Sequence, residues 1–309
     1  MNPMQAHIAK TTGVAALLGL LTAMPAAADP FFFSTGNVTN LIATASRPDT
    51  GAPFEIESAD DFVTTGPTSL TSATFTGLLT GGTTPANVGK VVVEIYRVFP
   101  NDSNVGRTSG APFFSTPEVP TRVNSPSDVE LDDRSTSAGN LTVITHVVNP
   151  MFTANNSVQP GGIHPLPGPP PQTTGGNGSV MGEEVEFDVT FTQPFLLSPD
   201  HFFFVPQVQV TGGDFLWLSG TRPIVAPGTP FPPGFTDLQE WTRDEMLAPD
   251  WLRVGTDIVG AGTFNAAFSL TGVVPEPASL SLLGAALAGM GLFGWRRGRR
   301  GQSAARTLT

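Results

Sequence analysis

A segment in which apolar and polar side chains alternate over eight consecutive residues, 184–191, constrains the fold most strongly. In EEVEFDVTF, residues 183–191, the apolar side chains fall on one side of an extended chain: Val185, Phe187, Val189 and Phe191. The other side is polar: Glu184, Glu186, Asp188 and Thr190. A period of two is that of a β-strand. The segment therefore predicts a strand with one face against a core and the other in water.

Further segments have the composition of strands, because β-branched and aromatic residues in them are bounded by Gly, Pro or Asn. They are Leu70–Leu79, Lys90–Phe99, Leu141–Val148, Phe202–Val210, Asp214–Leu218 and Thr263–Gly272, the last with Phe264, Ala266, Phe268 and Leu270 on one face. Pro206 predicts an edge strand or a bulge, because proline has no N–H for a sheet ladder. Short strands with frequent turns predict an all-β body over residues 29–274, an antiparallel β-sandwich or jelly roll.

Two segments of this body depart from the strand pattern. Thr236–Leu247 predicts one short helix, since Thr236 and Gln239 form a capping-box pattern and Pro249 follows the end. Residues 159–178 are rich in proline and glycine. We interpret them as a surface loop of one sandwich, in preference to a linker between two domains.

The N-terminus has the three parts of a secretory signal peptide over residues 1–28. Lys10 supplies positive charge, Gly13–Ala23 is apolar, and Ala26 and Ala28 give the small-residue pattern that signal peptidase accepts. We expect cleavage after Ala28, which would start the mature, exported chain at Asp29.

The C-terminus contains an apolar run that predicts a transmembrane helix over residues 278–295. This run carries no charge, and as a helix it would extend roughly 27 Å, close to the thickness of a bilayer core. An arginine cluster follows it and predicts a stop-transfer signal: Arg296, Arg297, Arg299 and Arg300. Under the positive-inside rule, the body lies outside the inner membrane and residues 301–309 form a cytoplasmic tail.

Pro275-Glu276-Pro277, followed by the apolar run and the arginine cluster, resembles the PEP-CTERM protein-sorting signal over residues 275–300. The resemblance implies an exported protein of a Gram-negative bacterium that makes exopolysaccharide. It also implies recognition by exosortase, a membrane-embedded cysteine transpeptidase-like enzyme that processes its substrate near the motif. The chain would then be anchored transiently before it reaches the cell surface or extracellular matrix. The nine residues after Arg300 depart from the usual abrupt end, and the resemblance implies no activity for the body.

The charge of the body excludes one large class of partner. Between Asp29 and Val274 there are 25 acidic and 9 basic residues, so this part carries a charge of about −16. It repels phosphates and has no basic stripe, so we expect no nucleic-acid partner. The chain contains no cysteine, which excludes disulfides and thiolate metal sites.

Motifs of catalysis are absent from the sequence, and we expect neither an enzyme nor a bound cofactor. There is no HExxH, GxSxG or CxxC pattern. The segment 81–91 contains Gly89-Lys90 but lacks the first glycine of a phosphate-binding loop, and Val91 replaces its Ser/Thr. The histidines of the mature body, His146, His164 and His201, lie in different segments, and we do not expect them to converge.

Two acidic stretches, 54–62 and 127–134, are the remaining candidates for a site. Calcium takes about six to eight oxygen ligands, so their carboxylates are candidate ligands: Glu57, Asp60, Asp61, Asp128 and Asp132. Neither stretch has EF-hand spacing, and a solvated acidic face is the favoured interpretation. A pair of such carboxylates could also serve a glycoside hydrolase.

The tryptophans of the body raise a further possibility. Trp217, Trp241 and Trp251 could form a sugar-stacking surface, but core packing is favoured for each.

The function that fits these observations is a structural or adhesive role in the cell envelope or exopolysaccharide matrix. The alternatives are a secreted carbohydrate-binding module and a carboxylate-dependent polysaccharide hydrolase. The expected partners are signal peptidase, exosortase and the membrane, with exopolysaccharide as a further candidate.

Overall fold

Extended strands joined by turns make up most of the computed structural model, which describes residues 28–51, 53–104, 119, 121–163, 173–224, 231–260 and 262–275. Ala28–Pro275 forms one compact unit. The strands are β1 (Asp29–Ser34), β2 (Val38–Ala45), β3 (Ile56–Thr64), β4 (Thr68–Leu79), β5 (Val88–Arg97), β6 (Asp132–Ser135), β7 (Leu141–Ala154), β8 (Ser157–Val158), β9 (Val180–Leu197), β10 (Asp200–Val210), β11 (Phe215–Gly220), β12 (Trp241–Asp244), β13 (Leu252–Arg253) and β14 (Phe268–Val274).

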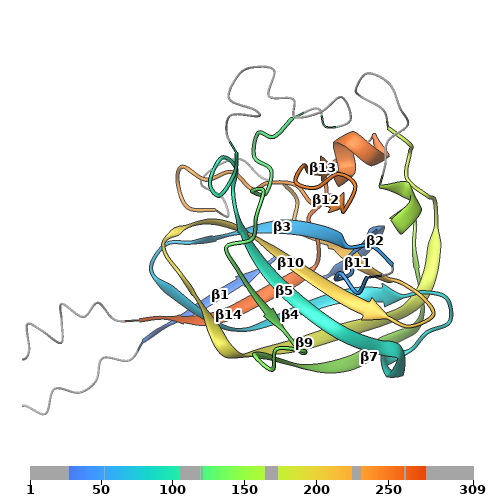
Figure 1. Ribbon diagram of the computed structural model, residues 1–309, viewed down its shortest axis with the longest axis horizontal. Coiled ribbons are helices and arrows are strands. Elements are labelled where there is room, and N and C mark those ends of the chain that lie inside the picture. The colour runs from blue at the N-terminus through green and yellow to red at the C-terminus, as the bar shows by residue number, and fades with distance from the viewer. Residues whose placement is uncertain are drawn as a thin grey trace, which may run out of the picture. The chain divides into compact units, whose positions relative to one another are not determined.

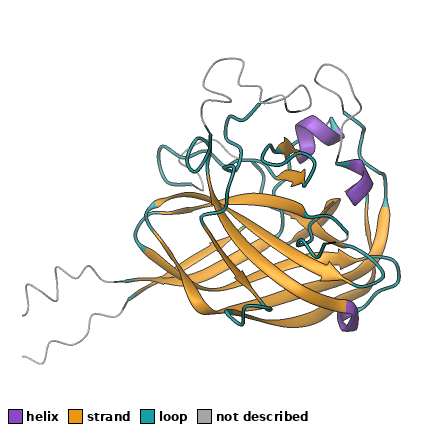
Figure 2. Cartoon of the chain, viewed as in Figure 1, coloured by secondary structure: helices purple, strands orange, loops and turns teal. Residues whose placement is uncertain are grey.

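These strands form two sheets, which confirms the predicted all-β body (Figures 1 and 2). The first sheet has the order β1-β14-β4-β11-β2-β8, with β9 on the other side of β4 and β7 beyond β9. The second has the order β13-β12-β3-β10-β5-β6. The pairs are antiparallel except β2 with β8. Each segment predicted as a strand contributes to one of these strands, although β14 begins at Phe268 rather than at Thr263.

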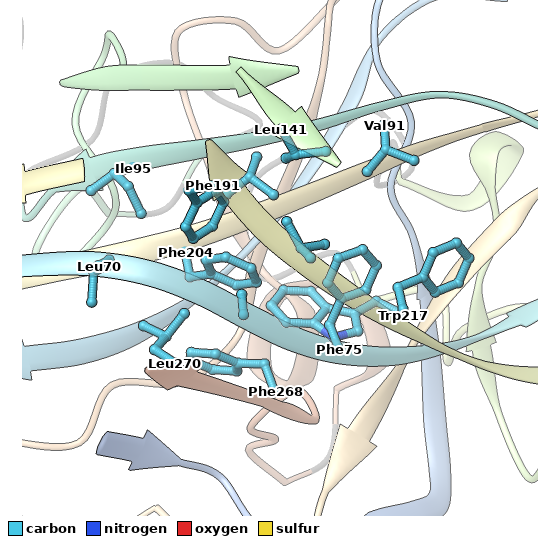
Figure 3. Packing of buried hydrophobic residues seen from close by; sticks show 14 of the residues in the cluster. Leu70, Phe75, Val91, Ile95, Leu141, Phe191, Phe204, Trp217, Phe268 and Leu270 are labelled. Atoms are coloured by element: carbon cyan, nitrogen blue, oxygen red, sulfur yellow. The ribbon is translucent and has the colours of Figure 1, made fainter. Parts of the chain in front are cut away.

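The main core lies between the two sheets and is rich in phenylalanine (Figure 3). Phe75 of β4 stacks on Phe187 of β9 at 5.0 Å between ring centroids, and Phe204 of β10 stacks on Phe268 of β14 at 5.1 Å. The four predicted inward-facing residues of β9 are all buried here. Burying each such ring contributes on the order of 2 kcal/mol, so this cluster holds the two sheets face to face.

Pro206 does not place its strand at an edge, because β10 lies between β3 and β5. The pairing with β3 ends at Phe204, before the proline is reached. The carbonyl oxygen of Pro206 accepts a hydrogen bond from Ser46 Oγ at 2.6 Å instead of pairing with β3. The N–H that proline lacks is therefore not needed for the β10–β3 ladder. The register with β5 shifts between Val208 and Val210, so the irregularity that the proline predicted is present two residues later.

The predicted helix at Thr236–Leu247 is wrong. The segment contains β12, which pairs with residues 56–59 of β3 and has every side chain buried. A capping box is worth about 1 kcal/mol, and it cannot compete with a strand that buries both faces and pairs its backbone. The described residues contain one longer helical segment, Val254–Val259, and two short 3₁₀ turns, Pro85–Asn87 and Pro160–Gly162.

Three apolar side chains on or beside β12 cover the outer face of the second sheet. Leu238, Trp241 and Trp251 pack there against Ala59, Tyr96, Phe203 and Val205. All nine residues of β3 are buried, although five of them are polar: Glu57, Ser58, Asp60, Asp61 and Thr64. From Ile56 onward, the acidic stretch at 54–62 is therefore interior rather than a solvated face, whereas Phe54 is exposed and Glu55 is half-buried.

Several predicted segments lie outside the described residues. They are residues 1–27 of the signal peptide with Ala26, the middle of the 159–178 segment, and everything after Pro275, including Glu276, Pro277, the helix at 278–295 and the arginine cluster. Within the described ranges, the helices are all too short or too polar to cross a membrane. β8 before the proline-rich segment and β9 after it belong to the same sheet.

Candidate functional site

The two ends of the body lie side by side. β1 pairs with β14 along its whole length, with Asp29 opposite Val274 and Ser34 opposite Ser269. Figure 1 shows the blue and the red strand together. Apolar and polar side chains alternate along β14: Phe268 and Leu270 enter the core, and Ser269 and Thr271 face outward. This alternation explains why β14 lies in the first sheet with one face on the core. A cut after Ala28 would therefore create an N-terminus beside Pro275.

The first acidic cluster is built around Arg243 of β12. Its Nε and Nη2 donate to the two carboxylate oxygens of Glu57, the Nη2 bond being 2.9 Å. Nη2 also donates to Tyr96 Oη at 3.0 Å, and Nη1 donates to the carbonyl oxygens of Asp128 and Pro249 at 3.1 and 3.0 Å. These bonds use all five guanidinium N–H groups. Glu57 is thus committed to an internal cation.

Aromatic rings close this cluster. The guanidinium carbon of Arg243 lies 4.4 Å from the ring centroid of Trp251, and Tyr96 Oη donates to Glu57 at 2.5 Å. Burial raises the pKa of Tyr96 above its usual range, and the charges of Glu57 and Glu94 add to this. Burial also raises the pKa of Glu94 well above normal, and repulsion from Glu57 is the second cause of this increase. The arrangement is that of a sealed ion pair.

Asp128 and Asp132 also have arginine partners. Arg122, itself buried, binds Asp128 through Nη2 and donates to Asp250 through Nη1 at 2.7 Å. Arg134 binds Asp132 in a bidentate manner, at 2.6 and 2.8 Å, and lies over the ring of Phe195 at 4.3 Å. Arginine with two parallel N–H bonds is a strong partner for a carboxylate.

Asp60 and Asp61 are oriented to opposite faces of β3. Asp60 accepts hydrogen bonds from the backbone N–H of Ala266 at 2.7 Å and of Asp61 at 3.0 Å. Asp61 lies 2.5 Å from Nε2 of His201 and accepts from the N–H of Leu238 at 3.1 Å. Burial raises the pKa of both carboxyl groups, that of Asp60 well above normal.

Glu240 is a further buried carboxyl group. Burial raises its pKa to about 8, although the nearby Thr44 hydroxyl lowers it in part. Neither of its oxygens makes a hydrogen bond of ordinary geometry within the described part of the chain.

The candidate calcium ligands therefore do not converge. Glu57, Asp60 and Asp61 lie along one buried strand, and the other two are bound by separate arginines. In the described residues, no three His, Asp or Glu side chains are grouped so that they could hold a metal ion.

Only the pairing of Arg134 with Asp132, two residues away on β6, could have been found from the sequence. Glu57 and Arg243 are 186 residues apart, and no local pattern joins them.

The tryptophans are core residues, as the favoured interpretation held. Trp217, Trp241 and Trp251 are each at most 1% exposed. The indole N–H of Trp217 donates to the carbonyl of Ala267, and that of Trp251 donates to the carbonyl of Ser127, each at 3.0 Å. They form no sugar-stacking surface.

The two described histidines lie apart, on different sheets. His146 is on the outer face of β7, with Nε2 3.2 Å from a carboxylate oxygen of Asp188, whereas His201 contacts Asp61 on β10. His164 is outside the described residues.

A cleft of about 390 Å³ lies on the outer face of the first sheet. Its floor is formed by polar residues of β4, β9 and β14, and its walls by the β1–β2 turn and Val148 of β7. The lining residues are Ser34, Gly36, Asn37, Val38, Thr74, Thr76, Val148, Glu184, Glu186, Ala267, Phe268 and Ser269. No motif in the sequence indicated this site, because its walls come from segments far apart in the chain.

Glu184 differs from the prediction that its face of β9 is wet. Its side chain is buried, at 7% exposed, although Glu186 beside it is only half-buried. Leu78, directly opposite Glu184 on β4, belongs to a second apolar cluster with Ile42 and Leu216. Val180, at the start of β9, packs against this apolar cluster, so the cluster lies on the outer face of the first sheet there. The cleft opens beside the cluster. Burial raises the pKa of Glu184, and repulsion from Glu186 adds to the effect.

Comparison with known proteins identifies the end of the chain. The model of the PEP-CTERM protein-sorting motif matches residues 273–300, which confirms the resemblance seen in the sequence. No curated protein and no solved structure matches the chain significantly. The motif implies an exported protein that exosortase processes and that is sorted to the surface of a Gram-negative cell.

Proposed function

We propose that this chain, which ends in a PEP-CTERM sorting motif, serves a structural or adhesive role in the cell envelope or exopolysaccharide matrix. The observation that carries the proposal is that the motif starts inside the last strand: the match begins at Val273, and β14 ends at Val274. The sorting signal thus follows the body without a linker, so the folded β-sandwich is the cargo that is sorted.

Each part of the C-terminal segment has a physical role in this proposal. Proline removes a backbone donor and restricts φ, so Pro275 and Pro277 would stop β14 and keep the motif extended for exosortase. The apolar run would hold the substrate in the membrane, and the arginines would stop translocation. Signal peptidase would act after Ala28, beside the same end of the sheet.

The test replaces Pro275, Glu276 and Pro277 together by alanine in a Gram-negative host that carries an exosortase. We expect the variant to stay in the inner-membrane fraction with the mass of an uncut C-terminus, while the wild-type chain is shortened and moves to the surface. Glu245→Gln, at an exposed position, is the control for a change of charge. Identical masses and fractionation for the variant and wild type would refute sorting through the motif.

A carbohydrate-binding role is a second candidate, and the cleft on the first sheet favours it. Its volume lies at the lower end of the range for small-ligand sites. Its polar lining offers hydrogen-bond donors and acceptors. The tryptophans, which are buried, do not support this role.

A further inference from the structure

We propose that the cleft on the first sheet binds an amino sugar, with Glu184 and Glu186 receiving its protonated amine and the surrounding hydroxyl and amide groups binding its hydroxyls. The inference deepens the carbohydrate-binding candidate and is independent of sorting through the C-terminal motif. It rests on three features of the cleft: an unpaired carboxylate on a buried side chain, a lining without cations, and a hydroxyl-rich floor.

The unpaired carboxylate is that of Glu184. Its side chain is more than nine-tenths buried and makes no hydrogen bond or ion pair with any described residue. Most of the residue is buried, but its carboxylate oxygens are not among the fully buried oxygens of the described residues, so they face the cleft. Proteins normally pair a carboxylate that is partly removed from water. Glu240 also lacks a cation among the described residues, but it is sealed in the interior, whereas Glu184 lines an open cleft. A ligand can therefore supply the partner that the chain does not.

The charges around the cleft select a cation. Glu186 is next to Glu184 on the same face of β9, and no basic residue is among the lining residues. The described basic group in register with Glu186 is His146 of β7, and it pairs with Asp188. Elsewhere in the body, Glu57, Asp128 and Asp132 each bind an arginine. The two glutamates of the cleft would repel an anionic ligand and attract an amine.

The rest of the lining selects a ligand with hydroxyl groups. Thr74 and Thr76 of β4 and Ser269 of β14 contribute hydroxyls, and Ser34 and Asn37 contribute a hydroxyl and an amide from the wall. Phe268, which contacts the cleft, is only 3% exposed and offers no ring face for stacking. Recognition would therefore depend on hydrogen bonds, as a polyhydroxylated ring with an amine requires.

A bare divalent cation fits less well. Calcium takes about six to eight oxygen ligands, and the cleft offers two carboxylates. The described part of the chain has no group of three metal-ligating side chains here. Calcium binding is nevertheless an outcome that the experiment must separate from amine binding.

The experiment titrates the full chain, purified in a mild detergent, with glucosamine, glucose, N-acetylglucosamine and calcium chloride in separate calorimetric runs. We expect saturable binding of glucosamine, and binding at least about tenfold weaker for glucose and N-acetylglucosamine, which lack the charge. Equal affinities for glucosamine and glucose would overturn the role of the carboxylates. Calcium binding that depends on Glu184, without binding of glucosamine, would also overturn it.

Three variants localise the effect. Glu184→Gln should lower the affinity for glucosamine at least about tenfold, because it removes a charge-assisted hydrogen bond. Glu183→Gln removes the same charge from the neighbouring position on the other face of β9, and it should leave the affinity unchanged. Thr76→Val retains the volume of a lining residue and should weaken the binding of glucosamine and of glucose alike.

If Glu184→Gln folds and binds glucosamine as the wild type does, the proposal is wrong. A wild-type chain that is sorted correctly but does not bind glucosamine would overturn this inference and leave the sorting proposal intact.

Discussion

Replacing Glu240 by glutamine should stabilise the body at alkaline pH and reduce the loss of stability that occurs as the pH rises. Glu240 is 1% exposed, and burial raises its pKa from 4.5 to about 8. Between these two values, the native carboxyl group keeps a proton that the unfolded chain has released. The native state therefore binds more protons, so the free energy of unfolding falls with increasing pH in this window and is constant above it.

The magnitude follows from the shift in pKa. Each unit is worth about 1.4 kcal/mol, so a shift from 4.5 to about 8 lowers the free energy of unfolding by at most about 5 kcal/mol across the window. Structural relaxation and water penetration reduce such penalties, and we expect about 2–3 kcal/mol. Glutamine has the shape of the neutral acid and does not ionise. The gain in unfolding free energy of the glutamine variant over the wild type should therefore be small at pH 5 and reach its full size near pH 8–9.

The assay is urea unfolding of the full chain at several pH values between 5 and 9, with Glu245→Gln as an exposed control. The quantity that matters is the difference in unfolding free energy between variant and wild type. Glu240 also raises the pKa of Asp60, so the difference includes a smaller change in the titration of that residue. A difference that is constant over the whole pH range would refute the protonated state of Glu240. So would a stabilisation that is largest at pH 5.

Three further predictions concern the other buried groups. Arg243→Met leaves Glu57 without its cation and should destabilise the body by about 3–5 kcal/mol in urea unfolding; a loss below about 1 kcal/mol would contradict the sealed ion pair. Phe75→Ala should lower the unfolding free energy by about 3–5 kcal/mol, whereas substitution of exposed Met246 by alanine should change it little. Calcium and chelator should leave the melting temperature unchanged, because Glu57, Asp128 and Asp132 already bind arginines; a rise with calcium would show a site that this account misses.

Local periodicity predicted the parts of the fold that depend on one strand at a time. The four inward residues of β9 were identified from alternation alone, because each apolar side chain had a polar neighbour to define the two faces. The same reasoning failed at Glu184, whose cross-strand neighbour Leu78 belongs to an apolar cluster with Ile42 and Leu216. A pattern within a strand states which side chains share a face, but not what lies above that face.

The acidic strand β3 shows the same limit more strongly. Glu57 and Asp61 suggested a solvated surface because charged residues are rarely buried without partners. Their partners, Arg243 and His201, lie far away in the sequence, and Arg243 was placed in a predicted helix. Tertiary pairing with β3 made that segment a strand. The cleft was unpredictable for a similar reason, since its lining residues come from six strands and the β1–β2 turn, which lie far apart in the sequence.

The pairing of β14 between β1 and β4 has a mechanical consequence for a protein handled by its C-terminus. Residues 269–274 pair with β1, and residues 268–273 pair with β4. Hydrogen bonds in an antiparallel ladder run perpendicular to the strands. A tensile load applied at Val274 along the strand axis would shear both ladders at once instead of opening the bonds one after another. The attachment point is therefore the end of a strand clamped on two sides, and the body can bear tension there without unravelling from its last residue.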